Sequence, residues 1–162
     1  MSKVNPIPEG QDRFIPHLVI DGAAEAMEFY KKAFGAVEVA RTPAPDGKRL
    51  MHAAMKVGDS IFYLSDDFPE YRGGKKANPN ALGASPVTIH LYLEDCDAMF
   101  KQAEAAGAII VFPPQDQFWG DRYGMLKDPY GHNWSFATHI ADPTPEEMAA
   151  AAEKMFGGAD HK

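Results

Sequence analysis

The stretch HLVIDGAAEAMEFYKKAFG at residues 17–35 decides the fold, because its pattern returns at residues 90–107 as HLYLEDCDAMFKQAEAAG. Each copy begins with a His-Leu pair that opens an apolar run, continues into a segment with helical spacing of apolar residues, and stops at a glycine. Two similar units packed about a shared axis place equivalent positions face to face. We therefore expect His17 and His90 to meet across a central cleft.

The repeat extends beyond these two stretches. The offset between the two histidines also separates two other pairs of identical residues: Arg49 and Arg122, Gly58 and Gly131. Each copy is expected to contain a strand, a helix and three more strands. The first has strands at 13–20, 37–42, 49–57 and 60–65 with a helix at 23–34; the second has strands at 87–93, 109–112, 122–127 and 133–139 with a helix at 96–106.

The predicted fold is α+β, with two βαβββ modules that form a curved mixed sheet around a cleft, followed by a C-terminal helix. In that helix Thr144 is expected to be the N-cap, Pro145 the first helical residue and Glu147 the partner in a capping box. The expected organisation is an N-terminal tail (1–12), a first module (13–65), a connector (66–86), a second module (87–139), and a C-terminal helix and tail (140–162).

Composition excludes several partners. The 162 residues carry a formal net charge of −7, and lysines and arginines cluster only in pairs, so a nucleic-acid partner is not expected. No run of about 18 apolar residues and no secretion signal is present, so we expect a cytoplasmic protein without a membrane partner. Cys96 is the single cysteine, which rules out an internal disulfide.

The end of the second copy is the most specific motif. It reads DPYGHNW at 128–134, preceded by WGDRYG at 119–124 and followed by ATH at 137–139. Two βαβββ units with this ending resemble the vicinal oxygen chelate superfamily, which groups glyoxalase I, bleomycin-resistance proteins, fosfomycin-resistance enzymes and extradiol dioxygenases. The three stretches are closest to its PhnB-like branch, and the resemblance covers roughly residues 14–156.

The resemblance implies a cleft that holds a divalent metal in the enzymatic members, ligated by a His from the first strand and a Glu from the last strand of each unit. Such an ion chelates two adjacent substrate oxygens. Aligned through the helices and their glycines, the histidine positions fall on Ile15 and Thr88, and the glutamate positions on Phe62 and Ser135. None of the four is a good metal ligand, so we predict neither the usual metal site nor a cofactor.

His17 and His90 stand two residues beyond the expected histidine positions. Because side chains alternate along a strand, both stay on the cleft face. They either belong to a hydrogen-bonded polar patch or form part of a displaced metal site. The second interpretation needs further ligands from a dimer partner or from the 66–86 connector.

The remaining candidates complete the predicted pocket. Trp119 is either an aromatic lip over the cleft or a hydrophobic plug. Arg122 either holds an anionic or carbonyl-bearing ligand or pairs with Asp121 or Asp128. Trp134 and Phe136 should point into the core, and His132 toward solvent. The residues expected to line the pocket are His17, Phe62, Thr88, His90, Tyr92, Trp119, Arg122 and Ser135.

The favoured hypothesis is a glyoxalase/bleomycin-resistance-like protein that binds a small organic molecule in the cleft without the family's usual metal. One alternative is a divalent-metal-dependent lyase, isomerase or oxygenase that uses His17 and His90. The other is a non-catalytic interaction or regulatory module. We expect a homodimer in each case, and the sequence leaves open the identity of the ligand and whether the protein is an enzyme.

Overall fold

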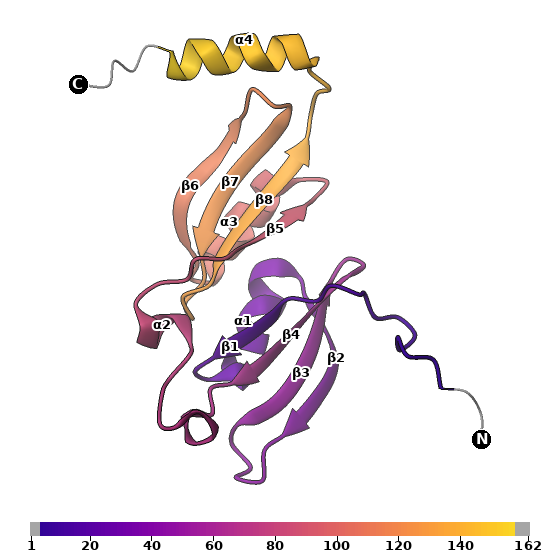
Figure 1. Ribbon diagram of the computed structural model, residues 1–162, viewed down its shortest axis with the longest axis vertical. Coiled ribbons are helices and arrows are strands. Elements are labelled where there is room, and N and C mark those ends of the chain that lie inside the picture. The colour runs from indigo at the N-terminus through magenta and orange to yellow at the C-terminus, as the bar shows by residue number, and fades with distance from the viewer. Residues whose placement is uncertain (1–3, 158–162) are drawn as a thin grey trace.

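The first half of the chain forms a βαβββ module. The computed structural model describes residues 4–157 (Figure 1). The elements of this module are β1 (His17–Ile20), α1 (Ala23–Phe34), β2 (Val37–Pro43), β3 (Leu50–Val57) and β4 (Ser60–Asp66). The sheet order is β1-β4-β3-β2, with β1 parallel to β4 and the other pairs antiparallel.

The second half repeats this topology. Its elements are β5 (Thr88–Tyr92), α3 (Cys96–Ala106), β6 (Ile109–Asp116), β7 (Asp121–Lys127) and β8 (Asn133–His139), in the sheet order β5-β8-β7-β6. The predicted pair of βαβββ modules is confirmed. The strands belong to two separate four-stranded sheets, and β1 and β5 each lie at a sheet edge.

Two segments lie outside the modules. The connector contains a 3-10 helix, η1 (Pro69–Arg72), and a short helix, α2 (Pro79–Leu82), whose N-cap Asn78 accepts a hydrogen bond from the amide of Ala81. The C-terminal helix is α4 (Pro145–Phe156), and both hydrogen bonds of the predicted capping box are present. It lies beyond the end of β8 and buries none of its residues (Figure 1). Within residues 4–157 no helix is long and apolar enough to cross a membrane.

Two predicted strands differ from the observed ones by several residues, whereas the others agree to within one residue at each end. The strand expected at 13–20 begins only at His17, because Pro16 has no amide hydrogen to donate and Phe14 is exposed. The strand expected at 109–112 continues to Asp116 through Pro113 and Pro114. Prolines are tolerated there because β6 is an edge strand with register shifts.

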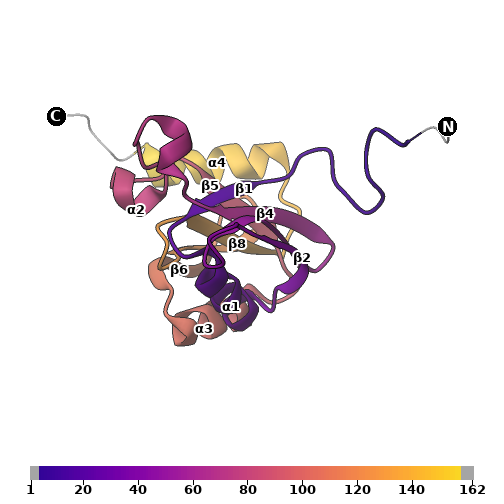
Figure 2. The same ribbon diagram turned by 90° about the horizontal axis from the view of Figure 1, so that it is seen from below.

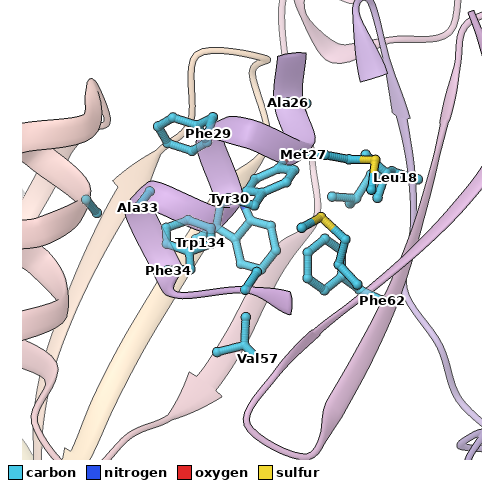
Figure 3. Packing of buried hydrophobic residues seen from close by; sticks show 14 of the residues in the cluster. Leu18, Ala26, Met27, Phe29, Tyr30, Ala33, Phe34, Val57, Phe62 and Trp134 are labelled. Carbon is cyan, nitrogen blue, oxygen red and sulfur yellow. The ribbon is translucent and has the colours of Figure 1, made fainter. Parts of the chain in front are cut away.

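The hydrophobic core lies where α1 and α3 cover one face of the two sheets (Figure 2). Tyr30 of α1 is at its centre, with ring centroids 5.4 Å from Phe62 and 5.6 Å from Trp134 (Figure 3). Trp134 and Phe136 are each 1% exposed, which confirms their predicted orientation. The helices thereby bury one face of each sheet. The opposite face, which carries His17 in the first sheet and His90 in the second, is not covered by them and is called the open face below.

The DPYGHNW motif stabilises this core through Asp128. The carboxylate is 2% exposed, and its Oδ2 accepts hydrogen bonds from the Tyr30 hydroxyl at 2.7 Å and the Trp134 indole at 2.9 Å. Its Oδ1 accepts the amides of Tyr130 and His132, each at 2.9 Å. Four donors satisfy a buried charge that would otherwise be costly, and they join α1 of the first module to β8 of the second.

Candidate functional site

A largely apolar groove of about 580 Å³ lies between β1, β5 and the connector. Successive residues of both strands line it, and segments of the connector complete its wall. The lining residues are Phe14, Pro16, His17, Leu18, Val19, Ala77, Pro79, Leu82, Ala84, Ser85, Pro86, Val87, Thr88, Ile89, His90 and His132. Three of the predicted pocket residues, His17, Thr88 and His90, are therefore brought together in one hollow.

His17 lies on the open face of the first sheet beside two other rings. Its ring centroid is 6.2 Å from that of His52 on β3 and 6.1 Å from that of Tyr63 on β4. The Tyr63 hydroxyl donates to Oε1 of Gln11 at 2.7 Å. Burial, together with the neighbouring His52 and Arg72, lowers the pKa of His17. The imidazole is therefore a neutral hydrogen-bonding group at neutral pH.

His90 lies on the open face of the second sheet. Its Nδ1 is 2.8 Å from the buried Ser135 hydroxyl, and its ring contacts Tyr92 edge-on and stacks near Tyr123. Burial lowers the pKa of His90, although nearby Asp121 opposes that shift. The two histidines thus present neutral polar groups on equivalent strands, with aromatic rings beside each.

Asp121 joins several predicted residues into a polar cluster on the second sheet. This carboxylate is 4% exposed and accepts hydrogen bonds from the Tyr92 hydroxyl at 2.9 Å and the Trp119 indole at 3.0 Å; His139 Nδ1 lies 2.8 Å away. Burial alone would raise the pKa of Asp121, but hydrogen bonds from His139, Tyr92 and Trp119 lower it. Trp119 is therefore held against the sheet beside Tyr123.

Phe62 departs from the expected arrangement. It is 4% exposed and packs in the hydrophobic core, on the opposite face of β4 from the residues beside His17. The strand pairing explains the difference, because His17 is opposite Tyr63 just as His90 is opposite Ser135. The first module has one more residue between its first and last strands than the second module has. Tyr63, and not Phe62, therefore occupies the position equivalent to Ser135.

Arg122 also departs from the expected arrangement. Its guanidinium pairs with Asp97 of α3 and, at 2.8 Å, with Asp116 of β6, and neither of the predicted partners, Asp121 and Asp128, is involved. The hydrogen bonds that the guanidinium donates to these carboxylates raise the pKa of Arg122. The side chain therefore braces α3 against the sheet and lies away from the groove.

His132 was expected to face solvent but is 9% exposed and lines the groove. Its Nε2 is 3.1 Å from the carbonyl oxygen of Val19, which links β1 to the turn before β8. Sequence reasoning missed this role because the partner lies far away along the chain. The available signal in the sequence was Gly131, directly before His132. The structure explains this glycine, because its φ is +91° and a Cβ there would clash with Pro79 and Asn80.

The residues present do not fit the metal site that the fold implies. The positions opposite each other on the open faces are occupied by His17 with Tyr63 and His90 with Ser135, and neither pair includes a carboxylate. Among residues 4–157 there is no group of three or more His, Cys, Asp or Glu side chains arranged to hold an ion. Two imidazoles alone fall short of the usual three protein ligands.

Comparison with known proteins identifies the fold. The uncharacterized protein Rv0887c of Mycobacterium tuberculosis is 48% identical over 143 residues, which cover 88% of this chain and 84% of that protein. The crystal structure of TioX from Micromonospora sp. ML1 has a TM-score of 0.61 at 26% identity and covers 82% of this chain and all of TioX. PhnB protein from Bacillus cereus has a TM-score of 0.58 at 18% identity, covering 78% of this chain and 99% of its own, and shows similarity of fold.

A family model extends this likeness over most of the chain. The model described as Glyoxalase/Bleomycin resistance protein/Dioxygenase superfamily matches residues 12–136, which include both βαβββ modules except the end of the last strand. The match and the topology agree with the resemblance carried by the DPYGHNW motif. The chain therefore belongs to the glyoxalase/bleomycin resistance protein/dioxygenase superfamily.

Proposed function

We propose that this protein binds a small organic molecule in the groove between β1 and β5, and that it does so without the family's usual metal. The groove is the observation that carries the proposal. Its volume of about 580 Å³ lies within the range typical of small-molecule sites. Binding alone would suffice for a sequestering protein of the bleomycin-resistance type.

The chemistry of the lining favours a predominantly apolar, uncharged ligand. Leu18, Val19 and Ile89 supply apolar surface, whereas His17 and His90 supply the polar groups. Because burial lowers the pKa of both histidines, they act as neutral donors or acceptors near neutral pH. A neutral polar group fixes the orientation of a ligand without requiring it to carry a charge.

The proposal is tested by binding to matched variants. Val87 lines the groove and is 63% exposed, and Val37 on β2 is 65% exposed and lies outside the groove. A panel of uncharged aromatic and aliphatic compounds should contain ligands that raise the melting temperature of the wild-type protein by a few degrees. Calorimetry should show that Val87→Glu weakens such a ligand about tenfold or more, whereas Val37→Glu retains its affinity.

Two results would overturn the proposal. One is a panel in which no compound raises the melting temperature, or in which Val87→Glu binds as well as Val37→Glu. The other is stoichiometric divalent metal in the purified protein that is lost in His17→Ala or His90→Ala. That second result would replace the proposal with the metal-dependent alternative.

A further inference from the structure

The backbone of β5 faces the groove with one unpaired edge. The amide of Leu93 donates to the carbonyl oxygen of Ala137 in β8 at 2.8 Å, so the backbone groups of alternate residues Leu91 and Ile89 also point toward β8. The N–H and C=O groups of Thr88 and His90 must then point the opposite way. That direction is the groove, because both residues line it.

The facing wall is the edge of β1. The carbonyl oxygens of Pro16 and Ile20 accept the amides of Tyr63 and Asp67 in or after β4, which turns the backbone of His17 and Val19 outward. The carbonyl oxygen of Val19 already has His132 as a partner. Across residues 4–157 no backbone hydrogen bond joins β1 to β5, and the two strands belong to different sheets. The groove therefore runs between two strand edges. On the β5 edge, the outward N–H and C=O groups of Thr88 and His90 have no partner among residues 4–157.

Apolar side chains border this edge. Phe14 and Leu82 are highly exposed although both line the groove, as is Val87 just before β5. An extended chain that hydrogen-bonds to a strand edge projects alternate side chains into the surface beside it. The combination of a free edge and apolar walls matches a ligand with a regular amide backbone and apolar substituents at every second residue.

We propose that the ligand of this groove is a short peptide, or a peptide-like molecule with the same spacing of amides, that adds as a strand to the free edge of β5. This inference rests on the proposed function and names its ligand class. β5 has five residues and β1 has four, so the available edge matches a peptide of about four residues. Hydrogen bonds to Thr88 and His90 give affinity, and β1 with its histidine forms the opposite wall.

The first experiment compares two probes with the same side chains, one of which lacks the backbone N–H donors. One is acetyl-Leu-Lys-Leu-Lys-amide, in which the lysines provide solubility, and the other is its depsipeptide analogue, in which ester oxygens replace the peptide N–H groups. Calorimetry should show the analogue binding about tenfold or more weakly, because it has lost its donors. Hydrogen exchange should show at least tenfold slower exchange of the Thr88 and His90 amides with the peptide bound, while the Leu91 amide, paired within the sheet, changes little.

A pair of variants provides a second measurement. Thr88→Pro removes an N–H that points into the groove, and proline is tolerated at such an edge position. Thr88→Val removes the hydroxyl and keeps the amide. We expect Thr88→Val to bind the peptide at least tenfold more tightly than Thr88→Pro. If Thr88→Pro does not fold, the probe comparison and hydrogen exchange on the wild-type protein decide the question.

The outcomes separate the two proposals. Equal binding of both probes, or peptide binding without protection of Thr88 and His90, overturns the strand addition and leaves the small-molecule proposal standing. Protection of these amides that grows with protein concentration in the free protein shows that a second copy occupies the edge, and also overturns it. If neither probe nor any compound of the panel binds, both proposals fail.

Discussion

At the scale of single residues, the buried Asp128 carboxylate accepts four hydrogen bonds and joins the two modules. Asp128→Ala leaves the Tyr30 hydroxyl and the Trp134 indole buried without an acceptor. We expect a loss of about 3 kcal/mol or more in the free energy of unfolding, measured by urea denaturation. Asp59→Ala, in the exposed turn between β3 and β4, is the control and should change it by less than about 0.5 kcal/mol. Equal losses in the two variants would refute this role.

The hydrogen bonds of His139 predict the sign of a pH dependence in the stability of the protein. Hydrogen bonds to Asp121 and then Asp142 raise the pKa of His139 above its ordinary value of 6.5. Its stabilising contribution is therefore complete below about pH 6.5 and is lost as the pH rises through the folded-state pKa. The melting-temperature difference between wild type and His139→Asn should be larger at about pH 5.5 than at about pH 9. A difference that is constant or larger at high pH would contradict the assignment.

Alternation along a strand predicted the orientation of individual residues when the register was correct. It placed Ser135 on the face of His90 and turned Trp134 into the core. It failed for Phe62, because alignment through helices and glycines does not record a one-residue slip at a strand. The pairing of Arg122 with Asp97 was also out of reach, because the pattern of one strand does not identify its contacts on a helix.

At the scale of elements, two equivalent glycines differ in what surrounds them. Both have positive φ, but a Cβ at Gly131 would lie 2.6 Å from Asn80 Oδ1 and 2.9 Å from Pro79 Cβ, whereas Gly58 has nothing within 4 Å. Gly58→Ala should cost about 1 kcal/mol of unfolding free energy from backbone strain alone. Gly131→Ala should cost about 3 kcal/mol and displace α2 from the groove. Urea denaturation that gave equal losses would show that the contact with α2 is unimportant.

Most elements were predictable, because local signals specify them. Gly35 and Gly107 end the two module helices, and the capping box at Thr144 starts α4. The groove itself was less predictable. Its wall includes Pro79 and Leu82 of the connector, where the sequence shows no periodicity, and their position depends on contacts with the second module.

At the scale of the whole molecule, exposed apolar side chains on the edge strand β6 favour self-association. Ile109 and Val111 are both more than half exposed. Such surface is often covered in a symmetric dimer. We expect sedimentation equilibrium to give about twice the chain mass of 17.8 kDa. A monomer at every concentration tested would rule out the homodimer.

The polar cluster around Asp121 belongs to one module alone among the described residues, since the equivalent face of the first sheet presents His17, His52 and Tyr63. The surroundings of the two groove histidines therefore differ in polarity even though the strands beneath them are copies. We expect a ligand bound in the groove as proposed to prefer one head-to-tail orientation, because turning it around would exchange these unlike surroundings. Substitutions beside one histidine should then change the contacts of one end of the ligand and leave those of the other end in place.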